Sequence, residues 1–133
     1  MQLLKILTPL AACAALATAA FPLSAQQTAQ TSVSAAQTQG DATLVEMQQA
    51  FRKSDRKRLT ALLPEARGHA LEPWAAYWEL RARLDEASDA EVAAFLQRYA
   101  GSYQEDRLRN DWLLLLGQRR DWKRFADQHP HYR

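Results

Sequence analysis

The chain has 133 residues, of which 47% are apolar, with four Gly, five Pro and a formal net charge of +2. This length accommodates one domain at most, and the composition is typical of a helical globular protein. The net charge is too small to imply a polyanionic partner.

The first 25 residues have the pattern of a secretory signal peptide. Lys5 supplies a positive charge, residues 6–23 form an apolar, Ala-rich run, and a small residue precedes a polar stretch. We expect cleavage after Ala25, which gives a periplasmic chain with no stable membrane span. The only cysteine, Cys13, lies in a sequence that also resembles a lipobox, so lipidation there is the alternative. In both cases the mature chain has no disulfide.

Residues 26–42 are rich in Gln, Ser and Thr and show no apolar periodicity, which predicts a disordered linker. The folded part is expected to be residues 43–133. Thr43 and Glu46 have the spacing of a capping box and predict the start of the first helix there.

Asp55 is the expected N-cap of a second helix, in which apolar residues recur with helical spacing from Leu59 to Ala66. Pro64 should kink or split this helix, and Gly68 should follow its end. Glu72-Pro73 then predicts a third helix with proline in its first turn. Its expected inward residues are Tyr77, Leu80, Leu84 and Ala87.

Capping boxes at Ser88-x-x-Glu91 and Ser102-x-x-Glu105 predict a fourth and a fifth helix. The fifth, over residues 102–121, carries Leu and Trp nearly all round and should be buried on two sides. Asp121 begins a sixth helix, which Pro130 should end. Its expected inward residues are Trp122, Phe125 and Ala126.

These elements predict an all-α fold of six helices arranged as stacked helical hairpins, because no stretch alternates with a period of two. Residues 54–59 also resemble residues 120–125, an offset of 66 that two repeats of about 33 would explain. We therefore expect an α-solenoid, that is a superhelical, tetratricopeptide-like segment.

Aromatic and basic side chains are the candidates for binding. Trp74 and Trp78 lie beside the inward stripe of their helix and are predicted to form an interface, whereas Trp112 and Trp122 are expected in the core. The most basic cluster is expected to be a solvated face, with an anionic polymer or membrane surface as the alternative and no nucleic acid as partner. This cluster consists of Arg52, Lys53, Arg56, Lys57 and Arg58.

No motif indicates catalysis, a cofactor or a metal. The three His lie outside any H-E-x-x-H spacing, and most carboxylates occupy cap positions or polar helix faces. We therefore assign no catalytic, cofactor-binding or metal-binding residue.

Three segments, in order, resemble motifs of one family: residues 68–80 (GHALEPWAAYWEL), residues 92–99 (VAAFLQRY), and residues 106–113 (DRLRNDWL) followed by Asp121-Trp122 and Phe125. The family is the soluble lytic murein transglycosylases, and the segments resemble the start of their N-terminal superhelical domain.

The resemblance implies a periplasmic enzyme that cleaves the bond between N-acetylmuramic acid and N-acetylglucosamine in peptidoglycan. In that family a C-terminal lysozyme-like domain carries the catalytic Glu, followed directly by Ser. None of the seven Glu here precedes Ser, so no catalytic residue carries over. We expect this chain to be the helical scaffold segment, without the catalytic domain, that meets glycan strands as part of a longer protein. The alternative is a free-standing periplasmic helical-repeat binding protein.

Overall fold

The computed structural model describes the backbone of residues 23–133 and the side chains from residue 37 onward. The expected signal peptide lies almost wholly outside these residues, as does Cys13. Within the described part, no helix is both long enough and apolar enough to cross a membrane.

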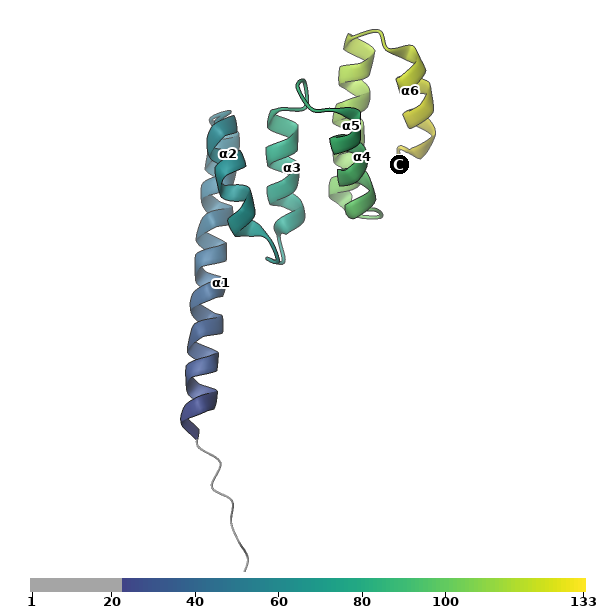
Figure 1. Ribbon diagram of the computed structural model, residues 1–133. Coiled ribbons are helices and arrows are strands. Elements are labelled where there is room, and N and C mark those ends of the chain that lie inside the picture. The colour runs from purple at the N-terminus through teal and green to yellow at the C-terminus, as the bar shows by residue number, and fades with distance from the viewer. Residues whose placement is uncertain (1–22) are drawn as a thin grey trace, which may run out of the picture.

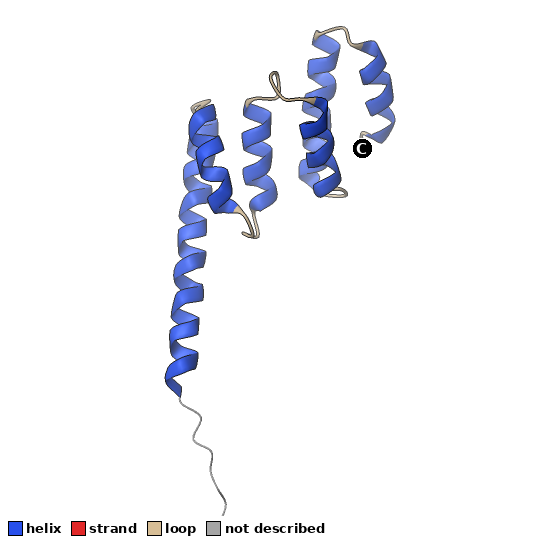
Figure 2. Cartoon of the chain, in the orientation of Figure 1, coloured by secondary structure: helices blue, strands red, loops and turns tan. Residues whose placement is uncertain are grey.

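Residues 23–133 form six α-helices and two 3₁₀ turns, with no strand among them, which confirms the all-α prediction (Figure 2). Figure 1 shows the helices side by side in a row that runs from α1 through α3 and α5 to α6. The elements are α1 (Leu23–Arg52), α2 (Arg56–Leu62), η1 (Leu63–Ala66), α3 (Glu72–Ala82), α4 (Asp89–Arg98), α5 (Tyr103–Gln118), α6 (Trp122–Gln128) and η2 (His129–His131).

The prediction of a disordered linker over residues 26–42 is wrong, because this segment is part of α1. Thr43 does not start a helix either: its hydroxyl donates to the Gln39 carbonyl, 3.1 Å away, within α1. Ala and Gln are good helix formers, and a helix that is already formed in the bundle extends without a new nucleation cost. The segment also has a tertiary contact, since His69 Nε2 lies 2.9 Å from Asp41 Oδ1.

The predicted starts of α2, α4 and α5 are confirmed by their caps. Asp55 accepts a hydrogen bond from the Arg58 N–H, and Ser88 and Glu91 form both arms of a capping box. Ser102 caps α5, but its partner Glu105 accepts from the Gly101 N–H at 2.7 Å rather than from Ser102. These caps satisfy N–H groups that a helix start would otherwise leave unpaired.

Two apolar cores hold the helices together. The first joins α1, α2, η1 and α3 around Met47 and Leu59, both fully buried. The second joins α3, α4 and α5 around Leu108 and Trp112. Partly buried Trp78 packs against both, so α3 links the two cores.

The C-terminal end is more open than the sequence predicts. Trp122 is 61% exposed and Leu114 is 59% exposed, so the expected burial of Trp122 and of both sides of α5 is wrong. Ala126 is exposed and Phe125 is half-buried. Helical periodicity identified the apolar residues, but no described helix covers this side of α5 and α6.

The 66-residue offset seen in the sequence corresponds to two turns of the same conformation. Ser54 and Arg120 both have φ of 57°, and the following residues, Asp55 and Asp121, cap seven-residue helices. Each of these helices passes into a 3₁₀ turn that contains a proline, Pro64 or Pro130. The α1–α2 and α5–α6 hairpins are therefore similar, and the predicted break at Pro64 is confirmed.

Candidate functional site

A pocket of about 550 Å³ opens between α3, α5 and the α1–α2 turn. Four of its residues recur at i, i+3, i+4 and i+7 on one face of α3: Trp74, Tyr77, Trp78 and Arg81. Three recur every four residues on α5: Tyr103, Arg107 and Asp111. Phe51 and Arg56 complete the part of the lining that the following paragraphs use. We call this cavity the aromatic–arginine pocket.

Trp74 lies among the other rings of the pocket. Its ring centroid is 5.9 Å from that of Trp78, 5.9 Å from that of Tyr77 and 5.8 Å from that of Tyr103. Phe51 stacks on Trp78 with centroids 6.4 Å apart. Because Trp74 and Trp78 are only partly buried and Tyr103 is 60% exposed, the cluster leaves aromatic surface open to a ligand.

A hydrogen-bond network fixes the floor of the pocket. Tyr77 donates its hydroxyl to Asp111 Oδ2 at 2.7 Å, and Arg107 Nε donates to the Tyr77 hydroxyl at 3.3 Å. Burial and the neighbouring Asp111 raise the pKa of Tyr77, although Arg107 opposes them. Tyr77 is thus held as a neutral donor that joins α3 to α5.

The pocket has more positive than negative charge. Arg81 Nε pairs with Asp111 Oδ2 at 3.0 Å, and Arg56 pairs with Asp85 and Glu86 outside the pocket. Arg107 pairs with no carboxylate among the described residues. One guanidinium is therefore left without a balancing anion.

The residues of the basic cluster differ in their ion pairs and in whether they line the pocket. The cluster consists of Arg52, Lys53, Arg56, Lys57 and Arg58. All five side chains are exposed, but Arg58 Nε donates to Glu46 Oε1 at 2.6 Å and Arg56 is paired as described above. Only Arg56 of the five joins Trp74 and Trp78 in the pocket. A role of these residues in an interface stays a prediction.

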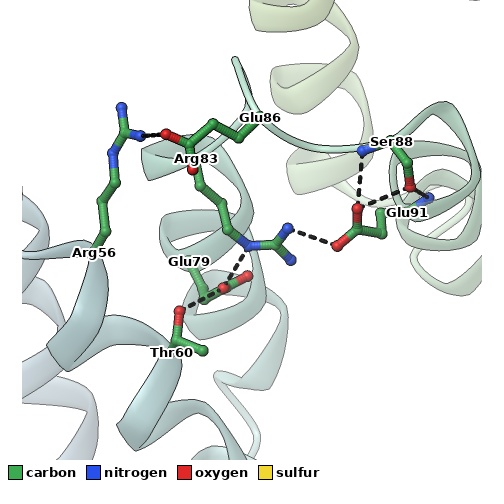
Figure 3. A network of polar contacts seen from close by, with 7 residues as sticks. All are labelled: Arg56, Thr60, Glu79, Arg83, Glu86, Ser88 and Glu91. Carbon is green, nitrogen blue, oxygen red and sulfur yellow. Dashed lines mark hydrogen bonds and ion pairs between the residues drawn. The ribbon is translucent and has the colours of Figure 1, made fainter.

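A second cavity, of about 390 Å³, lies against another face of α3 and contains a dense ionic network. Glu79, only 4% exposed, accepts from Arg83 Nε at 2.7 Å and from the Thr60 hydroxyl at 2.9 Å. Arg83 also reaches Glu91 at 2.6 Å, so its guanidinium lies between two carboxylates (Figure 3). The network ties α2, α3 and α4 together, since Glu91 is at the same time the cap partner of Ser88.

The carboxylates whose pKa departs from its ordinary value all shift downward. Burial alone would raise the pKa of Glu72 and Glu105, but hydrogen bonds from Arg98 and Arg109, and from backbone N–H groups, outweigh it and lower both. Hydrogen bonds from Ser88 and Arg83 lower the pKa of Glu91 to about 2. Among residues 37–133, no three His, Cys, Asp or Glu side chains gather where they could hold a metal ion.

Comparisons with protein-family models, with curated proteins and with solved structures each give no match. The sequence pattern predicts only part of the lining of this pocket. Trp74 and Trp78 belong to the predicted interface, whereas Tyr103, Arg107 and Asp111 do not, although their spacing of four on one helix places them on a common face.

Proposed function

We propose that this chain is the N-terminal helical scaffold segment of a periplasmic peptidoglycan lytic transglycosylase. The proposal rests on where the three segments that resemble this family lie in the fold. The first forms α3 and its entry, the second lies in α4, and the third forms the middle of α5. Together they build the contacts between successive helices that a superhelical scaffold requires.

Residues of the third segment act as packing and linking groups. Leu108 is fully buried and Trp112 is 7% exposed, both in the second core. Arg109 pairs with Glu105 at 2.7 Å and donates to Gln128 at 2.7 Å, which joins α5 to the end of α6. A motif whose residues hold helices together supports a scaffold function for this segment.

The repeated hairpin supports the finer proposal of a solenoid. In the first hairpin α3 covers Leu59 and Ala66, which are both 0% exposed. Their counterparts 66 residues later, Phe125 and Tyr132, are half-buried and 45% exposed. The second hairpin thus presents the surface on which a further helix in the position of α3 would stack.

The carboxylates with a shifted pKa do not have the property that a transglycosylase acid needs. A transglycosylase acid must be protonated near neutral pH, which requires a raised pKa. Glu72, Glu91 and Glu105 shift in the opposite direction. These three residues are therefore not candidates for the acid, and the family resemblance implies that a lysozyme-like domain of the longer protein carries it.

Co-sedimentation with purified peptidoglycan sacculi tests the proposal. The full chain, exported through its own leader and purified from the periplasm, should pellet with sacculi and release no anhydromuropeptides detectable by mass spectrometry. Cellulose of equal mass is the control for non-specific adsorption. A chain that stays in the supernatant with sacculi would contradict binding, and anhydro products would contradict the scaffold assignment.

A free-standing periplasmic helical-repeat binding protein is the second candidate. The aromatic–arginine pocket favours it, because α1, α2, α3 and α5 supply the pocket without any other domain. Anhydromuropeptide release by the complete product of the gene distinguishes the two: release supports the transglycosylase, and binding without release supports the second candidate.

A further inference from the structure

We infer that the aromatic–arginine pocket binds a saccharide that carries a single carboxylate. The inference rests on the proposed function, since it names the part of the glycan that this segment would hold. It starts from two properties that occur together in the pocket, namely open aromatic surface and one unbalanced guanidinium.

The aromatic surface suits a sugar ring. The C–H face of a pyranose is apolar, so it packs against an indole or phenol ring, while its hydroxyl groups remain available to polar partners. Trp74, Trp78 and Tyr103 form a continuous group, with Trp74 within 6 Å of both other ring centroids. The volume of about 550 Å³ lies within the range of roughly 300–1,000 Å³ that is usual for small-ligand sites.

The charge of the pocket favours an anionic ligand and limits that ligand to one negative charge. Arg56 and Arg81 already have carboxylate partners, so Arg107 supplies the one positive charge that a ligand can neutralise. A guanidinium matches a carboxylate through two parallel hydrogen bonds. Asp111, only 10% exposed, lies close by and would disfavour a ligand with a second negative charge.

Tyr77 holds Arg107 where this contact requires it. Arg107 Nε donates to the Tyr77 hydroxyl at 3.3 Å, while Tyr77 is anchored through Asp111 on the same helix as Arg107. This hydrogen bond uses Nε, and the Tyr103 hydroxyl also interacts with the Arg107 guanidinium, whose remaining N–H groups can bind a carboxylate. Among the sugars of peptidoglycan, the one that fits this description is muramic acid in glycan strands from which the stem peptide has been removed, because its lactyl carboxylate is otherwise held in an amide bond to that peptide.

Two disaccharides that differ mainly by that lactyl group provide the test. We would titrate the full chain with N-acetylglucosaminyl-N-acetylmuramic acid and with N,N′-diacetylchitobiose, and measure affinity by isothermal titration calorimetry. The muramyl disaccharide should bind at least about tenfold more tightly, the effect of one charge-assisted hydrogen-bonded contact. Equal affinity for the two sugars would overturn the inference.

Variants then locate the site. Arg107→Gln should lower the affinity for the muramyl disaccharide about tenfold, to that for chitobiose. Tyr103→Ala should lower the affinity for both sugars, because Tyr103 is exposed and contributes an aromatic ring rather than a charge. Lys123→Gln, which removes an exposed positive charge on α6 outside the pocket, is the control and should change neither affinity. A preference for the muramyl sugar that survives Arg107→Gln would overturn the inference.

A third ligand separates this inference from the proposed function. A disaccharide of N-acetylglucosamine and glucuronic acid also carries one carboxylate. If it binds as tightly as the muramyl sugar, the pocket inference is supported and the specific link to peptidoglycan is weakened. If sacculi pellet the unchanged chain although the muramyl disaccharide binds no more tightly than chitobiose, the proposed function holds and the pocket inference fails.

Discussion

Trp112→Ala and Trp122→Ala make the same chemical change in two environments. Trp112 is 7% exposed and packs in the second core with Leu108, Leu116 and other buried residues. Trp122 is 61% exposed, and its ring contact is with Phe125, at 6.1 Å between centroids. The free energy of unfolding should therefore fall much more for the first variant than for the second.

The expected magnitudes follow from burial. Truncating a buried Trp to Ala typically costs about 3 to 5 kcal/mol, because apolar contacts are lost and a cavity remains. An exposed aromatic pair contributes only about 0.5 to 1.5 kcal/mol. A domain of this size has a total stability of about 5 to 15 kcal/mol, so Trp112→Ala removes a large share of it.

Thermal unfolding followed by circular dichroism measures both changes. For a domain of 60–100 residues, 1 kcal/mol lowers Tm by roughly 4–8 °C, so Trp112→Ala should lower Tm by at least about 12 °C or abolish the transition. Trp122→Ala should lower it by about 2 to 12 °C, and by less than Trp112→Ala in the same chain. Equal shifts for the two variants would show that the core around Trp112 is not what holds the helices together.

Three further predictions concern a carboxylate, two strained turns and the leader. The pKa of Glu91 is lowered from 4.5 to about 2, so its stabilising contribution is complete above about pH 4.5 and is lost as the pH falls toward 2. Glu91→Gln should therefore lower Tm at pH 6, and this difference from the unchanged chain should shrink toward pH 2; a constant difference would contradict the lowered pKa. Ser54→Gly and Arg120→Gly should each raise the free energy of unfolding by about 0.5 to 1 kcal/mol, because both positions have φ of 57°, which L-residues with a side chain adopt at a cost. Each variant should therefore unfold at a higher urea concentration, and a lower midpoint would argue against these turns. Intact-mass measurement of the periplasmic form should give a chain that begins at residue 26, and a diacylglycerol-modified Cys13 at the N-terminus would instead establish lipidation.

The helix starts could be predicted from the sequence because their causes are local. Asp55, Ser88 and Asp121 each bond to a backbone N–H three residues further along, so spacing alone reveals them. Thr43 has the same local signal, but its hydroxyl bonds to the Gln39 carbonyl and lies 3.3 Å from Glu65 Oε2. A capping pattern inside a helix that continues through it cannot be told from a true start by spacing.

The pocket and the exposed C-terminal face depend on neighbours that the sequence does not place. Periodicity correctly put Trp112 on a buried face, yet the same pattern at Trp122 gave the wrong result, because a stripe is buried only where another helix covers it. Arg107 faces Tyr77 only because α3 and α5 pack together. Such pairings between distant segments need the tertiary arrangement.

The helical continuity of α1 changes how the N-terminal segment can act on the bundle. As a helix, residues 26–42 span about 25 Å at 1.5 Å per residue. A flexible chain of the same length would reach a similar root-mean-square distance, about 5–6 Å times the square root of its length, but in every direction. The difference is therefore one of direction rather than reach. Because α1 is one helix that also carries Met47 of the first core, an attachment at its start would fix the orientation of the pocket as well as the distance of the pocket from the attachment point.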